Sequence, residues 1–280
     1  PEMHIHAYSP LEVWQGAATL DMPVEDYLRQ LKAHGLNTLP GTAAEVLDDE
    51  VRAVLCPDKI NTRQWMQVIE TAHVVGLQTT ATIMFGHVDR YQHWARHLRR
   101  VREIQTGTKG FTEFVPLPFV PMEAPLYLKG RARKGPTFRE VLLMHAVARL
   151  ALHGQIDHIQ ASWVKLGDDG VRVALEAGCD DVGGTLMNET ITRAAGATHG
   201  EGKTPQELEA LILKAGRQPR QRSTDYGDVS SERQQAGRHA APLAAVINNM
   251  DSGKASGKPR RLLVRFAVET ENKEIGGCAR

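Results

Sequence analysis

Ionisable side chains alternate with apolar ones near the start of the sequence, in the run His4-Ile5-His6-Ala7-Tyr8. The two-residue period of a strand would place both histidines and the tyrosine on one face. Such a face can hydrogen bond to a ligand or exchange protons with it. We expect His4 to be a hydrogen-bonded interior residue, whereas for His6 and Tyr8 a structural and a functional interpretation are equally open.

The His-x-His spacing also suggests a metal site, which belongs to a different enzyme class. Two imidazoles on one strand face can hold zinc in barrel hydrolases, with further ligands from later strands. His87, His158 and Asp181 are the candidate partners. Because His158 opens its predicted strand and rim ligands follow strand ends, the metal-dependent hydrolase is an alternative rather than the main hypothesis.

A carboxylate follows the next strand-like segment, which ends in Pro40-Gly41. Small residues there leave room for a ligand against the backbone, and Glu45 could accept hydrogen bonds from an amino group or a ribose. An acidic residue favoured at the amino end of a helix would look the same. Both interpretations of Glu45 stay open at this point.

Hydroxyl side chains alternate in the sequence TTATIMFGH at 79–87. Thr80, Thr82 and Met84 share one strand face. Gly86 stands at the exit of the strand, where it would let a cofactor approach the backbone closely, and His87 follows it.

These residues lie on a recurring unit of strand and helix. Segments with strand character occupy 3–9, 36–42, 78–86, 111–118, 158–167 and 180–187, and helical periodicity occupies 21–34, 62–75, 90–105, 137–153, 170–177 and 204–215. Asp21 is a candidate N-cap, and Thr204 with Glu207 forms a capping-box pattern. The alternation predicts an α/β fold, a partial TIM-type (β/α) barrel of about six parallel strands with polar residues at its rim.

The composition favours small-molecule chemistry. The formal net charge of +1 argues against a nucleic-acid or anionic-membrane partner, and no apolar run or leader predicts a membrane segment or export. We therefore expect a cytoplasmic protein. The three widely spaced cysteines, Cys56, Cys179 and Cys278, suggest neither a disulfide framework nor a clustered metal motif.

The predicted barrel occupies residues 1–227. Residues 228–280 are rich in polar and small residues without a sustained period, so we predict a flexible C-terminal extension with an edge strand at 262–268. The first residue is Pro1, and a closed barrel has about eight strands. We therefore expect an N-terminally truncated barrel that lacks its first two strands.

Several stretches together resemble a known family. HIHAYSPLEVWQGA, LPGTAAEVLDDEVRAVLCPDKINT, TTATIMFGHVD, TEFVPLPFVPMEAPLYLKG, ASWVKLG and GGTLMNE occur in this order. They look like the tyrosine-using half of FO synthase, a radical S-adenosylmethionine (radical SAM) enzyme of deazaflavin coenzyme F-420 biosynthesis. The resemblance runs from Pro1 to about residue 227.

The resemblance implies a particular reaction. In the family, a [4Fe-4S] cluster cleaves S-adenosylmethionine to a radical that oxidises L-tyrosine. The 4-hydroxybenzyl fragment is then joined to 5-amino-6-(D-ribitylamino)uracil, and a companion radical SAM domain or subunit completes FO. The family's Cys-x3-Cys-x2-Cys loop is absent from this sequence, so we expect the chain alone to bind no cluster, to hold no metal and to be inactive.

The resemblance also suggests site residues. Glu45 and the 82–86 stretch, with Thr82, Met84 and Gly86, resemble the parts that contact S-adenosylmethionine. The candidate catalytic or substrate-binding residues, expected at or near strand ends, are His6, Tyr8, His87, Glu113, Ser162, Lys165, Asn188 and Glu189. Glu113 could also be a buried structural carboxylate, and Lys165 a solvated rim lysine. Arg220 and Arg222 are left out of the site because arginines there more often cap a barrel bottom or face solvent.

Three alternatives remain. A radical SAM enzyme of the futalosine route to menaquinone shares the same chemistry. The metal-dependent hydrolase would use His4 and His6. A degraded, non-enzymatic remnant would account for the irregular segment after Gly227.

Overall fold

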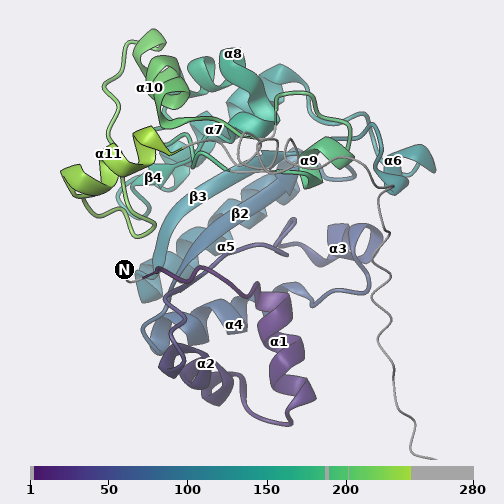
Figure 1. Cartoon of the computed structure of the whole chain (residues 1–280). Coiled ribbons are helices and arrows are strands. Elements are labelled where there is room, and N and C mark those ends of the chain that lie inside the picture. The colour runs from purple at the N-terminus through teal and green to yellow at the C-terminus, as the bar shows by residue number, and fades with distance from the viewer. Residues whose placement is uncertain (1–2, 187–188, 201, 241–280) are drawn as a thin grey trace, which may run out of the picture. The chain divides into compact units, whose positions relative to one another are not determined.

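A parallel sheet forms the centre of the fold in the computed structural model, which describes residues 3–186, 189–200 and 202–240. Its strands, in spatial order, are β1 (Thr38–Leu39), β2 (Gln78–Phe85), β3 (Phe111–Pro118) and β4 (His158–Ile159). Single parallel bridges add His6 beside Thr38 and Asp181 beside Gln160. The six predicted segments therefore lie side by side in chain order (Figure 1), which confirms the predicted α/β fold.

The outermost segments are shorter than predicted. Residues 3–9 and 180–187 contribute only the bridges of His6 and Asp181 within the described part of the chain. β4 ends at Ile159, and a helix begins at Trp163, so the predicted strand over 158–167 is wrong in its second half. An apolar run of this length fits a buried strand and a buried helix equally well.

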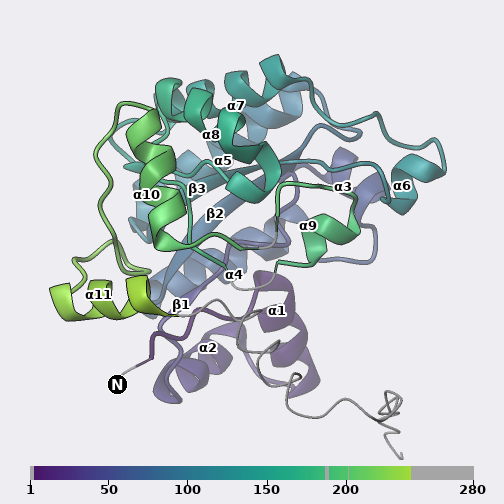
Figure 2. The same ribbon diagram turned by 45° about the horizontal axis from the view of Figure 1, so that its top comes forward.

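Helices cover the outer face of the sheet, and they include all six predicted ones. Among the described residues they are α1 (Pro10–Thr19), α2 (Val24–Ala33), α3 (Asp49–Leu55), α4 (Thr62–Val74), α5 (Tyr91–Thr108), α6 (Pro125–Leu128), α7 (Phe138–Ala151), α8 (Trp163–Glu176), α9 (Ile191–Ala194), α10 (Pro205–Lys214) and α11 (Ser231–His239). In Figure 2, α7, α8 and α10 lie along the part of the outer face near β3 and β4, and α1 and α2 lie along the part near β1.

Local capping explains several helix starts. The predicted capping box of α10 is present, because the Thr204 hydroxyl accepts the Glu207 N–H and the Glu207 carboxylate accepts the Thr204 N–H. A capping box at Ser9 opens α1, a helix that the sequence analysis missed. Asp21 is not an N-cap, since α2 begins at Val24 after Pro23.

The main core lies between the sheet and the helices. Ala81, Ile83 and Phe85 of β2 are fully buried on the outer face, where Phe85 meets Trp94 of α5 edge to face at 5.2 Å. Thr80, Thr82 and Met84 alternate with them, as predicted, and face the interior of the barrel. Because the apolar side chains of β2 are buried against the helices, the alternating residues of the strand are the ones that face the interior of the barrel.

The segment after residue 227 begins with an ordered helix. Residues 231–239 form α11, although no helix is predicted there. The edge strand predicted at 262–268 lies outside the described residues. Across the described ranges, no helix combines the length and the apolar character that a membrane span requires.

We predict that Gly41→Ala destabilises the fold, because an added Cβ would lie 1.9 Å from the Thr80 carbonyl oxygen. The expected loss in free energy of unfolding is about 1–3 kcal/mol or more, measured by urea denaturation of the chain. Gly107→Ala in α5 is the matched control, since its Cβ meets no atom within 4 Å, and it should gain up to about 1 kcal/mol. Equal stability of the two variants would contradict the close approach.

Candidate active site

The carboxyl end of β2 continues into a turn that Asp89 closes. The Asp89 carboxylate accepts the N–H groups of Gly86 at 2.9 Å and of His87 at 2.6 Å, and also the indole N–H of Trp94. Gly86 has φ +95°, and a Cβ there would lie 2.3 Å from Cδ of Pro136. Glycine is therefore required at this exit because of the positive φ and the close approach of Pro136, whereas the predicted approach of a cofactor to Gly86 stays a prediction.

His87 is buried beneath this turn in a neutral state. Its Nε2 donates to the Met84 carbonyl at 2.9 Å, and its Nδ1 accepts the Val88 N–H at 2.7 Å. Burial lowers the pKa of His87, although the nearby Asp89 acts in the opposite direction. Because both ring nitrogens are occupied, the geometry favours a structural role for His87 over proton transfer.

Glu45 reaches the same edge of the sheet from the segment after β1. Its backbone oxygen accepts the Met84 N–H at 2.8 Å, and its carboxylate forms an ion pair of 2.8 Å with Lys59. The hydrogen bond and the charge of Glu45 outweigh burial and raise the pKa of Lys59. The pair places one anion and one cation beside the β2 turn, an arrangement that suits the ammonium and carboxylate of an amino acid.

Thr82 shapes the loop that leads to Glu45. Its hydroxyl donates to the Gly41 carbonyl at 2.7 Å, and the Thr80 hydroxyl accepts the Gly41 N–H at 2.8 Å. Both hydroxyls are thereby used within the protein. Of the four residues predicted to bind a cofactor, Glu45 presents a charged group at the edge, whereas Thr82 and Gly86 set the backbone.

The first turn of α8 carries two further candidates to the carboxyl edge. Ser162 is buried at its N-cap and makes no side-chain capping bond. Lys165 is half-buried, and no described residue forms an ion pair or hydrogen bond with its ammonium group. Burial lowers the pKa of Lys165, while the charge of Glu189 acts to raise it.

Glu189 and a helix kink complete this region. The Glu189 carboxylate accepts the Thr192 N–H at 2.9 Å at the start of α9. α8 is kinked at Gly167, which has φ 65° and ψ 177°. Asn188 lies outside the described residues.

His6 lies away from the residues at the carboxyl edge, and His4 is exposed, so the expectation of an interior His4 is wrong. His6 Nδ1 and His4 Nε2 both hydrogen bond to the Thr38 hydroxyl, at 2.7 and 2.8 Å. Thr38 pairs with Gln78, the first residue of β2, so this cluster lies at the amino end of the sheet. Tyr8 is 42% exposed just before α1.

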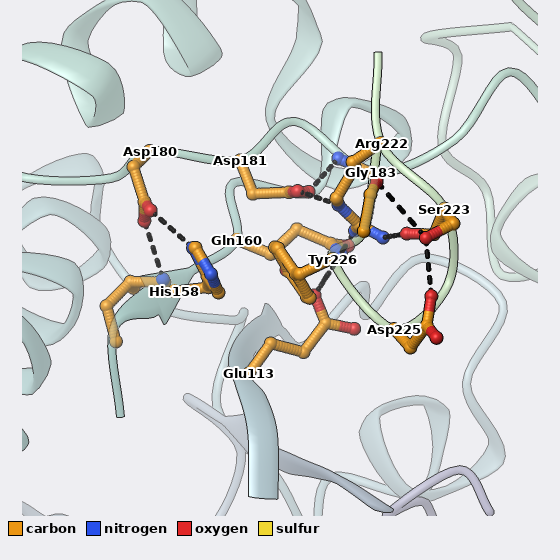
Figure 3. A network of polar contacts seen from close by, with 12 residues as sticks. Glu113, His158, Gln160, Asp180, Asp181, Gly183, Arg222, Ser223, Asp225 and Tyr226 are labelled. Carbon is orange, nitrogen blue, oxygen red and sulfur yellow. Dashed lines mark hydrogen bonds and ion pairs between the residues drawn. The ribbon is translucent and has the colours of Figure 1, made fainter. Parts of the chain in front are cut away.

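Glu113 also lies towards the amino end, in a buried polar network (Figure 3). In the sheet register Glu113 pairs with His158, the first residue of β4. Glu113 was predicted at or near a strand end, and it lies near the amino end of the sheet rather than at the carboxyl edge. Gln160 donates to its carboxylate at 3.0 Å, and the Tyr226 hydroxyl donates to the same oxygen. Burial raises the pKa of Glu113, which agrees with the alternative of a buried structural carboxylate.

Arg222 links the network to the neighbouring strand. It forms ion pairs with Asp181 and, at 3.4 Å, with Glu113. Burial alone would lower the pKa of Arg222, but the hydrogen bond and charge of Asp181 raise it. The guanidinium lies 4.0 Å from the ring of Tyr226, whose other face stacks on His158 at 3.7 Å. Arg222 thus caps the barrel bottom, an interpretation that the sequence left open.

Sequence reasoning did not select Lys59, Asp89, Arg222 or Tyr226 as site or network residues. Asp89 and Lys59 stand inside the stretches that carry the family resemblance, so that pattern could have indicated them. Arg222 and Tyr226 lie more than a hundred residues from Glu113 in the sequence, and no local pattern reveals such a contact.

One cavity lies at the side of the sheet formed by the segment around Asp181. It has a volume of about 640 Å³ and lies between α10, the 178–185 segment and the 217–222 segment. Among its lining residues, Asp181 and Arg222 pair with each other, and Arg220 and Glu209 have ion-pair partners elsewhere. A smaller cavity of about 370 Å³ lies at the carboxyl edge beside Lys165.

The described residues do not support the metal-dependent hydrolase. Within them, the group with suitable ligand geometry is Asp48, Glu50 and His93, whose ligand atoms lie within 4.8 Å of one another. Asp48 already forms an ion pair with Arg96 at 3.1 Å. His4 and His6 instead share the Thr38 hydroxyl.

Comparison with solved structures defines the fold class. Methylornithine synthase (PylB) aligns with a TM-score of 0.52 at 18% identity, over 77% of this chain and 59% of that chain. The likeness supports the predicted α/β barrel architecture. Residues 108–234 match the family described as the CofH/MqnC C-terminal region.

Curated relatives then make the resemblance specific. The FO synthase of Nocardia farcinica is 53% identical over 88% of this chain and 28% of its own length, and that of Mycobacterium tuberculosis (strain H37Rv) is 53% identical over 81% and 26%. The 5-amino-6-(D-ribitylamino)uracil–L-tyrosine 4-hydroxyphenyl transferase of Methanocaldococcus jannaschii is 50% identical over 80% of this chain and 63% of its length. The predicted resemblance to FO synthase is confirmed, and the chain spans about a quarter of those synthases.

The cysteines of the described region do not fit an iron-sulfur cluster. Cluster ligands are thiolates grouped around one site, whereas Cys56 follows α3 and Cys179 follows α8. Both are buried, and burial raises the pKa of the Cys179 thiol to about 12. Cys278 lies outside the described residues.

We predict that Arg222→Met is strongly destabilising, because it leaves the Glu113 and Asp181 carboxylates buried without a cation. The expected loss is about 3–5 kcal/mol near neutral pH. Burial already raises the pKa of Glu113, and without the cation its protonated form is favoured further in the folded state, so the loss should shrink as the pH falls. Urea denaturation at about pH 7 and pH 5 measures the difference.

The matched control is Arg220→Met, since Arg220 is 71% exposed and its partner Asp228 is 85% exposed. We expect a loss below about 1 kcal/mol for this variant. Losses of the same size for the two variants would contradict the role assigned to Arg222.

Proposed function

We propose that this chain is part of a radical SAM transferase of FO biosynthesis. In the proposed reaction, the bond between Cα and Cβ of L-tyrosine breaks, the 4-hydroxybenzyl group joins 5-amino-6-(D-ribitylamino)uracil, and the remainder leaves as 2-iminoacetate. S-adenosylmethionine would be the oxidant and would end as methionine and 5′-deoxyadenosine. The observation that carries the proposal is the 50% identity to a transferase whose name states both substrates, over 80% of this chain. We further propose that the protein acts in the cytoplasm.

The cofactors proposed for the complete enzyme are a [4Fe-4S] cluster and S-adenosylmethionine. The cluster would supply the electron that opens the radical chemistry, but its ligands would have to come from outside the described residues. The role of this chain is to bind and orient substrates and to exclude water from the barrel interior.

For S-adenosylmethionine, we propose that the Glu45–Lys59 pair binds its amino and carboxylate groups. The two side chains differ in charge and lie next to the turn at Gly86, which Asp89 and Pro136 hold in place. Thr82 and Asp89 would hold this surface in place through the bonds described above. Met84, half-buried beside Glu45, would contribute apolar contact.

The menaquinone-pathway alternative is weaker. The matched family covers both CofH and MqnC, whereas curated relatives at 50–53% identity are named FO synthase or the tyrosine 4-hydroxyphenyl transferase. We also propose a companion radical SAM domain or subunit that completes FO.

The decisive experiment uses the full-length polypeptide that contains this chain. After reconstitution with iron and sulfide, we expect formation of 5′-deoxyadenosine that depends on L-tyrosine, and a coupled product when the ribitylaminouracil is added. A cluster-loaded protein that forms 5′-deoxyadenosine with a futalosine derivative but not with tyrosine would overturn the proposal.

We predict that Glu45→Gln weakens the use of S-adenosylmethionine, because the neutral amide loses the charge that would bind an ammonium group. The expected rise in KM for S-adenosylmethionine is about 10- to 100-fold, measured by initial rates of 5′-deoxyadenosine formation. Glu25→Gln, at a 49% exposed ion pair of α2, should leave the KM unchanged. An unchanged KM in Glu45→Gln would reject this assignment.

A further inference from the structure

The smaller cavity combines apolar walls with a cation that has no described partner. It lies where β3 and β4 end, with a volume of about 370 Å³, within the range of roughly 300–1,000 Å³ typical of small-molecule sites. Phe119, Phe138 and Val141 are among its apolar lining residues, and Lys165 reaches it from the first turn of α8.

The ammonium group of Lys165, which has no described ionic partner, favours a ligand with a negative charge. Removing a charge from water is costly unless an opposite charge or hydrogen bonds replace the water. Lys59, the lysine on the other side of the carboxyl edge, has its carboxylate partner at 2.8 Å. The described part of the chain provides no such partner for Lys165.

The cavity adjoins the surface proposed for the cofactor. Phe119 forms part of its wall and meets His87 edge to face, with ring centroids 5.7 Å apart. Pro136, another lining residue, packs against Gly86. A ligand in the cavity would therefore lie next to the β2 turn.

We infer that this cavity binds the amino-acid substrate, with the aromatic ring between the apolar walls and its carboxylate on Lys165. The inference rests on the proposed function and names the binding site for one of its two substrates. Thr198 and His199 line the same cavity and offer hydrogen-bonding groups to a phenol.

The chemistry of the other ligands fits this cavity less well. The ribitylaminouracil is uncharged and carries many hydroxyl groups, which apolar walls leave without hydrogen bonds. S-adenosylmethionine carries a sulfonium cation, which Lys165 and the lining residue Lys134 would repel. An aromatic amino acid matches both the walls and the charge.

The test measures binding by calorimetry in the reconstituted full-length polypeptide with S-adenosylmethionine present. We expect Lys165→Met to weaken L-tyrosine binding by about 10- to 100-fold, and Lys165→Arg to retain most of it. Tyramine, which lacks the carboxylate, should bind the wild type more weakly than tyrosine does. Lys165→Met should bind tyramine and tyrosine alike. Lys129→Met, an exposed lysine outside the cavity, is the control and should bind like the wild type.

A second variant tests the cavity independently of charge. Thr198→Trp would fill the space from its exposed rim and should abolish tyrosine binding while the unfolding midpoint stays unchanged. Tyrosine binding that survives both Lys165→Met and Thr198→Trp would overturn the inference and leave the proposed function standing. A change confined to the affinity for S-adenosylmethionine would also overturn it. A wild-type protein that neither binds tyrosine nor consumes it would overturn the proposed function itself.

Discussion

The arrangement of the site depends on the burial of one face of a parallel sheet. Ala81, Ile83 and Phe85 are fully buried against the helices, and the period of two then directs Thr80, Thr82 and Met84 into the interior. Because the paired strands run in the same direction, their carboxyl ends gather at one edge. Glu45, the Gly86 turn and the first turn of α8 meet there for this reason.

The two ends of the sheet differ in how their polar groups are paired. At the amino end, Glu113, Asp181, Arg222 and Tyr226 satisfy one another, and buried groups paired in this way stabilise a scaffold. At the carboxyl edge, Lys165 lacks a described ionic partner. Incompletely paired charges in partly buried positions are typical of ligand sites, so the carboxyl edge suits chemistry and the amino end suits support.

Sequence reasoning predicted which face of a strand a side chain occupies better than which end of the sheet it lies at. β3 has its predicted bounds, and β2 ends one residue before the predicted end, because both strands are flanked by glycine and alternate strongly. The period of two correctly grouped Thr80, Thr82 and Met84 on one face, whereas His6 and Glu113, expected at or near the strand ends of the rim, lie towards the amino end. The face of the strand that a side chain occupies follows from the local period of two. Its position between the two ends of the sheet depends on the register with neighbouring strands, which the local pattern does not encode.

The remaining differences come from contacts over long sequence distances and from ambiguous apolar runs. The resemblance indicated the residues around Gly86, since they are contiguous in the chain. Tyr226 reaches Glu113 only through the folded path of the last described segment, so it left no signal. The run after Ile159 was predicted as strand, and its helical part places Trp163 and Val164 in the core, a packing that the local pattern does not reveal.

The kink at Gly167 divides α8 into two separate helical segments. Its φ of 65° interrupts the helical path, and an L side chain would be strained there and would approach the imidazole of His199 at 2.7 Å. The turn that bears Lys165 is consequently not continuous with the helix whose Val171 and Leu175 are locked in the core. Trp163 and Val164 hold that turn in the core as well, so the two segments of α8 can follow different directions while both stay fixed to the sheet.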